Sequence, residues 1–313
     1  PNQPVSISND VFVLAGGVLT HGPNAGAEVN KLYLYVGSNL YVDAGGRIDV
    51  TGKGYAAGNG PGKGVGSQYG GSYGGIAGIG GGSAGPTYGS VSAPTNLGSG
   101  GSETAGGGAI FATVRGTLRQ DGVICANSAY AVNYAGSGGT ISLSAGRLTG
   151  AGLIAADGWA NRGAGGRIAA LLTDPAATFD LFTGQMTAWG TNWGGAGTIY
   201  REPPGVGVGR GGATVDNDSR NAGITDLPPA TNATPLELQK ITFTLTNTSV
   251  LKVTTNVTIR NIWLGSPAST LNLNANTLYV RAKEHSLAPG AVETNGGAIV
   301  WLGAGDGSVL VIY

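Results

Sequence analysis

The chain of 313 residues contains 60 glycines, and its 17 Lys and Arg residues balance its 17 Asp and Glu residues, so the formal net charge is zero. This balance argues against nucleic-acid binding and against attraction to anionic membranes, because both use an excess of positive charge. The 41% of hydrophobic residues argues against disorder, because disordered chains combine low hydrophobicity with high charge. We therefore expect a folded, glycine-rich β protein.

The first repeated phrase begins with a glycine, continues with a large and then a small apolar residue at alternate positions, and ends in a turn residue. Apolar residues at every second position between turn residues predict a short strand. Repetition at a spacing of roughly 30 residues is typical of stacked repeat architectures. The four copies occupy residues 46–52, 122–128, 152–158 and 184–190.

A second strand phrase, Gly-Gly-x-Ile or Ala-Gly-x-Ile, follows each copy after a loop of variable length. Its copies end at Ile110, Ile141, Ile168 and Ile199. A third short strand precedes the first phrase, near Leu40, Leu118, Leu148 and Phe182. The order of the phrases is constant while loop length varies, as stacked repeats allow. We therefore predict an all-β fold, a parallel β-helix or solenoid with about three strands per repeat, over residues 1–202.

The longest glycine-rich loop is an insertion at about 51–108. Two interpretations stay open: an ordered glycine lattice lying on the repeats, or a flexible surface tract held by Tyr69, Tyr73 and Tyr88. Partial order is favoured, because glycine lets backbones pack closely and tyrosines can anchor them.

Residues 203–235 interrupt the pattern with prolines and glycines and are predicted to be an irregular connection. Strands resume over 236–313 with far less glycine and a shorter period of about 20 residues. We interpret the chain as one solenoid in two sections rather than two unrelated domains.

The lined-up phrases resemble the glycine-rich right-handed parallel β-helix segments of large secreted and surface proteins of environmental bacteria, such as adhesin and autotransporter passenger modules. The resemblance covers about residues 30–200 well and implies right-handedness and an extracellular or cell-surface location. It implies no catalytic motif, since β-helices serve as lyases, hydrolases, adhesins and fibres alike. The first residue, Pro1, suggests a chain released from a longer precursor. The only cysteine, Cys125, is expected to be a small buried apolar residue.

The repeat alignment predicts a column of Thr51, Asn127, Asp157 and Trp189 at the turn after one strand. Hydrolysis of a polysaccharide needs two carboxylates about 5 to 9.5 Å apart, and this column offers only Asp157. A turn-stabilising ladder is therefore favoured over a β-helical polysaccharide lyase or hydrolase, and we expect no catalytic residue.

Asp216 and Asp218 form the densest acidic segment and are a weak candidate for a Ca²⁺ site, the only cofactor that the sequence suggests. The segment lacks the glycine and the glutamate of an EF-hand loop, so a solvated turn is favoured. His21 and His285 have no partner at a zinc-ligand spacing. The sequence contains no run of about 18 apolar residues, the length that would suggest a membrane span.

Trp159, Trp189 and Trp193 lie in or beside the glycine-rich loops of consecutive repeats. Exposed rings in this arrangement would stack on the sugars of an extracellular polysaccharide. Alternatively, the rings cover the apolar side of the loops.

The C-terminal segment Val309, Leu310, Val311, Ile312 and Tyr313 is an apolar strand with no polar cap. Uncapped strand edges pair with other chains, and a head-to-tail contact that does not close builds a filament. We therefore expect a homo-oligomer or polymer: a structural or adhesive β-solenoid that assembles into a fibre, sheath or surface layer. The alternative function is a polysaccharide-binding module.

Overall fold

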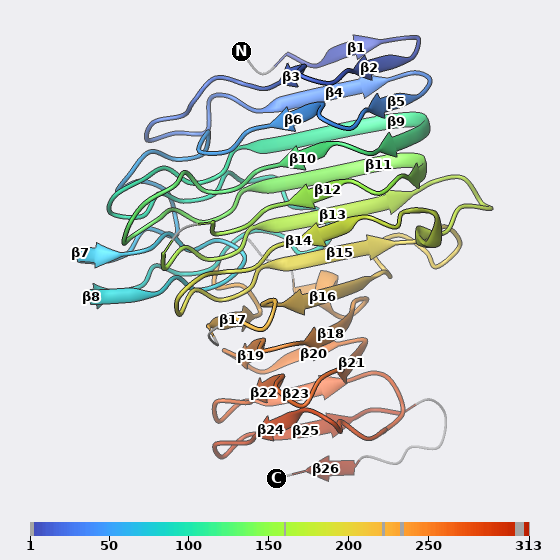
Figure 1. Ribbon diagram of the computed structural model, residues 1–313. Coiled ribbons are helices and arrows are strands. Elements are labelled where there is room, and N and C mark those ends of the chain that lie inside the picture. Colours follow the sequence, from blue (N-terminus) through green and yellow to red (C-terminus); the bar gives the residue numbers. More distant parts are fainter. Residues whose placement is uncertain (1–2, 160, 221–222, 232–234, 304–309, 313) are drawn as a thin grey trace.

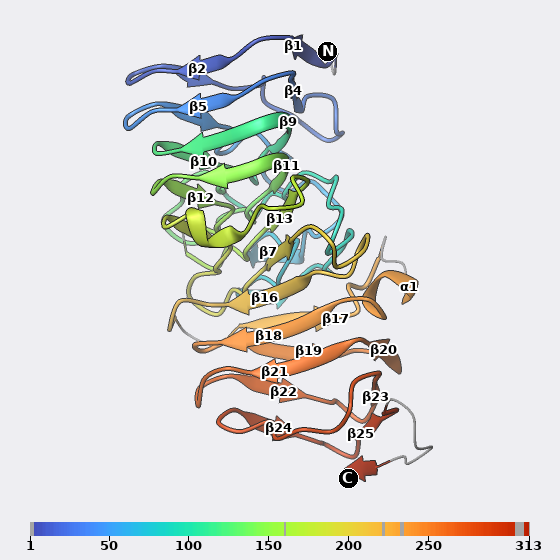
Figure 2. The same cartoon turned by 90° about the vertical axis from the view of Figure 1, so that its right-hand side faces the viewer.

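The computed structural model describes residues 3–159, 161–220, 223–231, 235–303 and 310–312, and its regular secondary structure is almost entirely β-strand, joined by long loops (Figure 1). The two helices among these residues are short: η1, a 3₁₀ turn at Phe179–Leu181, and α1 at Pro235–Leu238. In the described part of the chain, no helix has the length and apolar character that crossing a bilayer requires. Strands are stacked from the N-terminal to the C-terminal end of the molecule (Figures 1 and 2).

The largest sheet, called the main sheet below, has 11 strands and contains strands from both halves of the chain. Its neighbouring strands pair in parallel except β15 and β16, which are antiparallel. Its path follows β1 (Val5–Ile7), β4 (Leu32–Val36), β9 (Ala109–Gln120), β11 (Thr140–Thr149), β13 (Arg167–Leu172), β15 (Thr198–Glu202), β16 (Gly212–Asp216), β18 (Thr242–Thr246) and β21 (Asn261–Leu264), with β5 (Leu40–Val42) paired to β9 and β2 (Val11–Val13) paired to β5.

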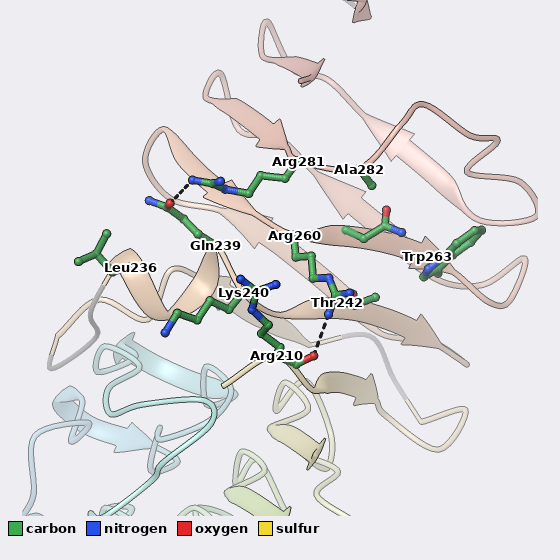
Figure 3. A pocket seen from close by; sticks show the side chains of 10 residues that line it. Arg210, Leu236, Gln239, Lys240, Thr242, Arg260, Trp263, Arg281 and Ala282 are labelled. Atoms are coloured by element: carbon green, nitrogen blue, oxygen red, sulfur yellow. Dashed lines mark hydrogen bonds between the residues drawn. The ribbon is translucent and has the colours of Figure 1, made fainter. Parts of the chain in front are cut away.

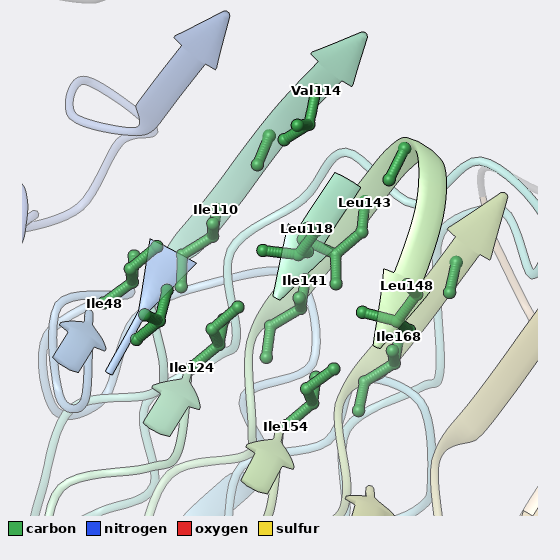
Figure 4. Packing of buried hydrophobic residues seen from close by; sticks show 14 of the residues in the cluster. Ile48, Ile110, Val114, Leu118, Ile124, Ile141, Leu143, Leu148, Ile154 and Ile168 are labelled. Carbon is green, nitrogen blue, oxygen red and sulfur yellow. The ribbon is translucent and has the colours of Figure 1, made fainter. Parts of the chain in front are cut away.

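A second parallel sheet faces the first half of the main sheet. It contains β3 (Val18–Leu19), β6 (Arg47–Asp49), β10 (Val123–Cys125), β12 (Leu153–Ala155) and β14 (Gln185–Thr187). The register pairs Ile48, Ile124, Ile154 and Met186 in one column, as the first phrase predicted. The column of Ile110, Ile141, Ile168 and Ile199 in the main sheet follows from the second phrase. Both columns belong to one buried core, the first core (Figure 4).

Two of the predicted third strands are not separate elements. Leu118 and Leu148 lie in β9 and β11, which continue from the second phrase through a register shift between Ala145 and Arg147. Phe182 makes only an isolated bridge with Gly150. The structure therefore has fewer and longer strands here than the pattern predicted.

The second half of the chain adds two four-stranded sheets beside the main sheet. One contains β17 (Ile224–Leu227), β19 (Val250–Val253), β22 (Thr270–Asn272) and β24 (Ala291–Glu293), and the other β20 (Val257–Ile259), β23 (Thr277–Val280), β25 (Ala298–Trp301) and β26 (Leu310–Ile312). Register partners such as Leu251 and Leu271 confirm the shorter period. The segment 203–235 differs from the prediction, because β16 and β17 lie within it: glycines and prolines interrupt it, but they leave room for two strands.

The core changes sides of the main sheet at the antiparallel pair. In β15, Ile199 packs into the first core, whereas its neighbour Tyr200 packs into a second core with Ala213 and Val215 of β16. Tyr200 and Ala213 are direct register partners and share a face. Because consecutive strand residues point to opposite faces, the two cores lie on opposite faces of the main sheet.

The insertion at 51–108 packs on the face of the main sheet that is opposite to the first core. It contains one antiparallel hairpin, β7 (Val65–Tyr69) and β8 (Ile79–Ser83). Tyr73 and Tyr88 are fully buried, and the Tyr73 hydroxyl lies 2.6 Å from Thr140 Oγ1. Arg167, the register partner of Thr140, is also buried and donates from Nε to the Tyr88 carbonyl. Tyrosines therefore fix this insertion to the repeats.

Glycine is required where the backbones of the loops touch. A Cβ added at Gly107 would overlap the Ala126 carbonyl oxygen, and one added at Gly165 would overlap that of Ala188. The high glycine content therefore reflects close contact between stacked loops rather than disorder.

Candidate functional site

Three members of the predicted column, Asn127, Asp157 and Trp189, belong to a hydrogen-bonded ladder around Asp157, whereas Thr51 contacts Asp49 and Cys125 instead. The Asp157 side chain is buried; Oδ1 accepts the Trp189 N–H and Oδ2 accepts the Thr187 hydroxyl. The Asp157 N–H in turn donates to Asn127 Oδ1, and Asn217 Oδ1 accepts the Gly190 N–H. Burial raises the pKa of the Asp157 carboxyl to about 7. Both carboxyl oxygens bond within the protein, so the geometry suits a structural role.

Two of the three predicted tryptophans are exposed. Trp159 and Trp193 have 53% and 62% of their surface accessible, and Trp193 lines a shallow, largely apolar pocket with residues of β8 and β17. Trp189 is half-buried, because the Arg220 guanidinium lies 3.7 Å from its ring centroid. Trp159 and Trp193 are therefore available to a ligand, whereas Trp189 is covered.

Asp216 and Asp218 lie in a turn. Asp216 Oδ1 accepts from the Asp218 N–H and from Asn247 Nδ2, and Asp218 forms an ion pair with Arg220 at 3.2 Å. No group of three or more His, Cys, Asp or Glu side chains that could hold a metal occurs among the residues that the structure describes. A Ca²⁺ ion at this turn would have to compete with these bonds.

Of the predicted assembly edge, Leu310, Val311 and Ile312 form β26, while Val309 and Tyr313 lie outside the described residues. β26 is the last strand of its sheet and pairs antiparallel to β25. The pattern alone did not predict this change of direction.

One pocket lined by described residues was not predicted. Its volume is about 700 Å³, and it lies beside the strands β18 and β21 (Figure 3). Four cationic side chains line it, together with Trp263, and none of its lining residues is acidic. We call Arg210, Lys240, Arg260 and Arg281 the basic row.

The sequence did contain a signal for the basic row. Arg260 and Arg281 are separated by one period of the second section, and Arg210 and Lys240 each lie two residues before a strand of the main sheet. Aligning the repeats of the second section places these four cationic residues at neighbouring positions of successive repeats. The formal net charge of zero for the whole chain gave no indication of this local cluster of positive charge.

No protein-family model matches the chain, and no curated protein or solved structure is significantly similar to it.

Proposed function

We propose that the chain is a parallel β-helix in two sections, which serves as an extracellular structural or adhesive element. The observation that carries the proposal is the repeated register: equivalent residues of successive repeats pair in parallel within each of two facing sheets. No shift separates Ile48, Ile124, Ile154 and Met186 in the second sheet, or the column that contains Ile141 in the main sheet. Each repeat then buries its own apolar residues against the neighbouring repeats, so the protein can become longer without needing a wider core.

The junction between the sections is compatible with one continuous winding. The antiparallel β15–β16 pair reverses the strand direction, and the core moves to the other face of the main sheet. Reversing both the strand direction and the buried face is equivalent to rotating the second section by half a turn about the stacking axis. A rotation does not change the hand of a helix. Both sections would therefore wind with the same hand, and the resemblance to right-handed β-helices of surface proteins suggests which one.

The surface supports a structural or adhesive role. Charged residues make up only 11% of the chain, and the glycine loops stack backbone on backbone. A surface with few charged side chains favours lateral packing between copies. Unpaired strand edges supply backbone groups for contact between copies.

Electron microscopy and sedimentation velocity of the purified protein test this proposal. We expect elongated particles that associate into fibres, sheets or larger assemblies. Elongated particles that stay monomeric at all concentrations would contradict self-assembly, and compact spherical particles would contradict the β-helix itself.

Polysaccharide binding at the glycine loops is the second candidate function, because Trp159 and Trp193 are exposed on adjacent loops. Asn192 Nδ2 of one loop donates to Asn161 Oδ1 of the other and holds the two loops together. A glycan array with Trp159→Ala and Trp193→Ala tests it. Trp189→Ala is the control that should keep binding, because Arg220 covers that ring.

A further inference from the structure

The basic row follows the repeat of the second section. Arg260 and Arg281 come directly after the register partners Ile259 and Val280 of β20 and β23. Arg210 and Lys240 each come two residues before the register partners Gly212 and Thr242. Neighbouring strands are about 4.8 Å apart, so the four residues come from successive layers along the stacking axis rather than from one strand. The Arg281 guanidinium points toward Gln239 and the Arg260 guanidinium toward the Arg210 carbonyl (Figure 3).

No described carboxylate neutralises these four charges. Five ion pairs occur among the described residues, and none of them includes a member of the basic row. The basic row is therefore a cluster of positive charge with no described carboxylate within ion-pair distance, and an anionic ligand would complement it.

Hydrogen bonds orient two of the guanidinium groups. Arg260 donates from Nη1 to the Arg210 carbonyl at 2.9 Å, and Arg281 donates from Nη2 to Gln239 Oε1 at 2.6 Å. Each guanidinium has five N–H donors in a fixed plane. The remaining donors can therefore bind a carboxylate or sulfate with two parallel hydrogen bonds.

An aromatic platform lies in the same pocket. Trp263 is 46% exposed and stacks on His285, with ring centroids 3.8 Å apart. Contacts with Asn261 and Trp301 fix the imidazole: its Nε2 lies 2.9 Å from Asn261 Oδ1, and its ring meets Trp301 edge to face. The Trp263 ring is thus held in a defined orientation beside the basic row.

We propose that this pocket binds a linear anionic polysaccharide that carries carboxylate or sulfate groups. The polymer lies along the stacking axis, its anionic groups bind the guanidinium groups of the basic row, and one sugar ring stacks on Trp263. This site is separate from the glycine loops, and binding here does not depend on self-assembly of the protein.

The pocket favours an acidic glycan over a nucleic acid. Proteins that bind single-stranded nucleic acids stack successive bases on several aromatic side chains along a basic groove. Here a single exposed aromatic ring lines the pocket, and the chain as a whole has no excess of positive charge.

Titration of the whole chain with paired probes tests the proposal. Polygalacturonate is compared with its fully methyl-esterified form, dextran sulfate with dextran, and an oligothymidylate serves as the nucleic-acid probe. We expect the chain to bind polygalacturonate, dextran sulfate or both, with an affinity that falls as salt rises, and not to bind their neutral forms. The acid that binds more tightly identifies the anionic group.

The double variant Arg260→Gln/Arg281→Gln should weaken binding by about tenfold or more, from the loss of two charge-assisted contacts. Trp263→Ala should weaken it as well. The control Arg119→Gln/Arg147→Gln removes two exposed arginines that pair with Asp121 and Asp174 and should bind as the wild type does, with circular dichroism showing that all variants fold.

Four results would overturn the proposal: no binding of either acidic glycan, equal binding of the neutral forms, equal affinity for oligothymidylate, or unchanged binding by the double variant. None of these bears on self-assembly, so the two proposals fail separately.

Discussion

The substitution Asp157→Asn tests the ladder that joins consecutive repeats. Burial raises the pKa of the Asp157 carboxyl from its ordinary 3.8 to about 7, so the folded protein holds this proton more tightly than the unfolded chain does. The free energy of unfolding should therefore fall as the pH rises between these two values, and stay lowered above them. The difference between the two pKa values corresponds to a decrease of about 4 kcal/mol in the free energy of unfolding.

An asparagine fits the same bonds without a charge. Its Oδ1 accepts the Trp189 N–H, and its Nδ2 donates to the Thr187 hydroxyl oxygen. Asn127 and Asn217 already accept backbone N–H groups in the same ladder. We expect Asp157→Asn to match the wild type near pH 4 and to be more stable at pH 8, by up to about 4 kcal/mol.

Urea unfolding followed by tryptophan fluorescence between pH 4 and pH 8 measures this difference. Asp174→Asn is the control: the Ala176 N–H and the Arg147 guanidinium lower the pKa of Asp174, so its titration lies below this range. An identical pH dependence in the wild type and in Asp157→Asn would refute the burial of a neutral acid at this position.

Three further predictions concern the core, the glycine loops and acid stability. Ile154→Ala removes a fully buried side chain and should lower the free energy of unfolding by about 2–5 kcal/mol; a change near zero in urea unfolding would contradict the close-packed column. Gly107→Ala should cost about 1–3 kcal/mol through overlap with a carbonyl oxygen, whereas Gly212→Ala, whose Cβ would meet nothing within 3.7 Å, should cost much less in the same titration. Burial lowers the pKa of His21, whose Nε2 accepts the Ala109 N–H, so stability should fall as the pH drops below the ordinary histidine pKa of about 6.5. His21→Gln should remove that part of the acid sensitivity, and an unchanged acid profile would argue against it.

The strand pairing of the first section could be predicted because its signal is local and repeated. A glycine, an alternating apolar pair and a turn residue recur around Ile124, Ile154 and Met186, and stacking such copies in register is the simplest way to bury them together. The same reasoning placed Asp157 between Asn127 and Trp189, as the structure does.

The reversal at β15 and β16 could not be predicted from such patterns. β15 carries the adjacent buried residues Ile199 and Tyr200, which face two different cores, so its pattern specifies neither one buried face nor the direction of the next strand. The choice depends on tertiary contacts of Tyr200 and Ala213. Local periodicity specifies a strand, but not its partner or its direction.

The pocket beside the basic row has no local sequence signal of the kind that the aromatic glycine loops and the acidic segment provide. The basic row is assembled from positions in four different repeats, and each of its residues alone resembles an ordinary solvated side chain. Trp263 is at an outward-facing position of β21. The sequence pattern does not show whether a side chain at such a position is exposed to solvent or packs against a neighbouring element.

Disulfide trapping across β9 and β11 tests the in-register stacking most directly. Arg119 and Thr149 are register partners on these parallel strands, and the spacing of about 4.8 Å between paired strands lies within the Cα range of a disulfide. In a Cys125→Ser background, Arg119→Cys/Thr149→Cys should cross-link on oxidation, whereas the out-of-register pair Arg119→Cys/Arg147→Cys should not. Equal cross-linking of both pairs, or none in the first, would contradict the stacked register on which the account depends.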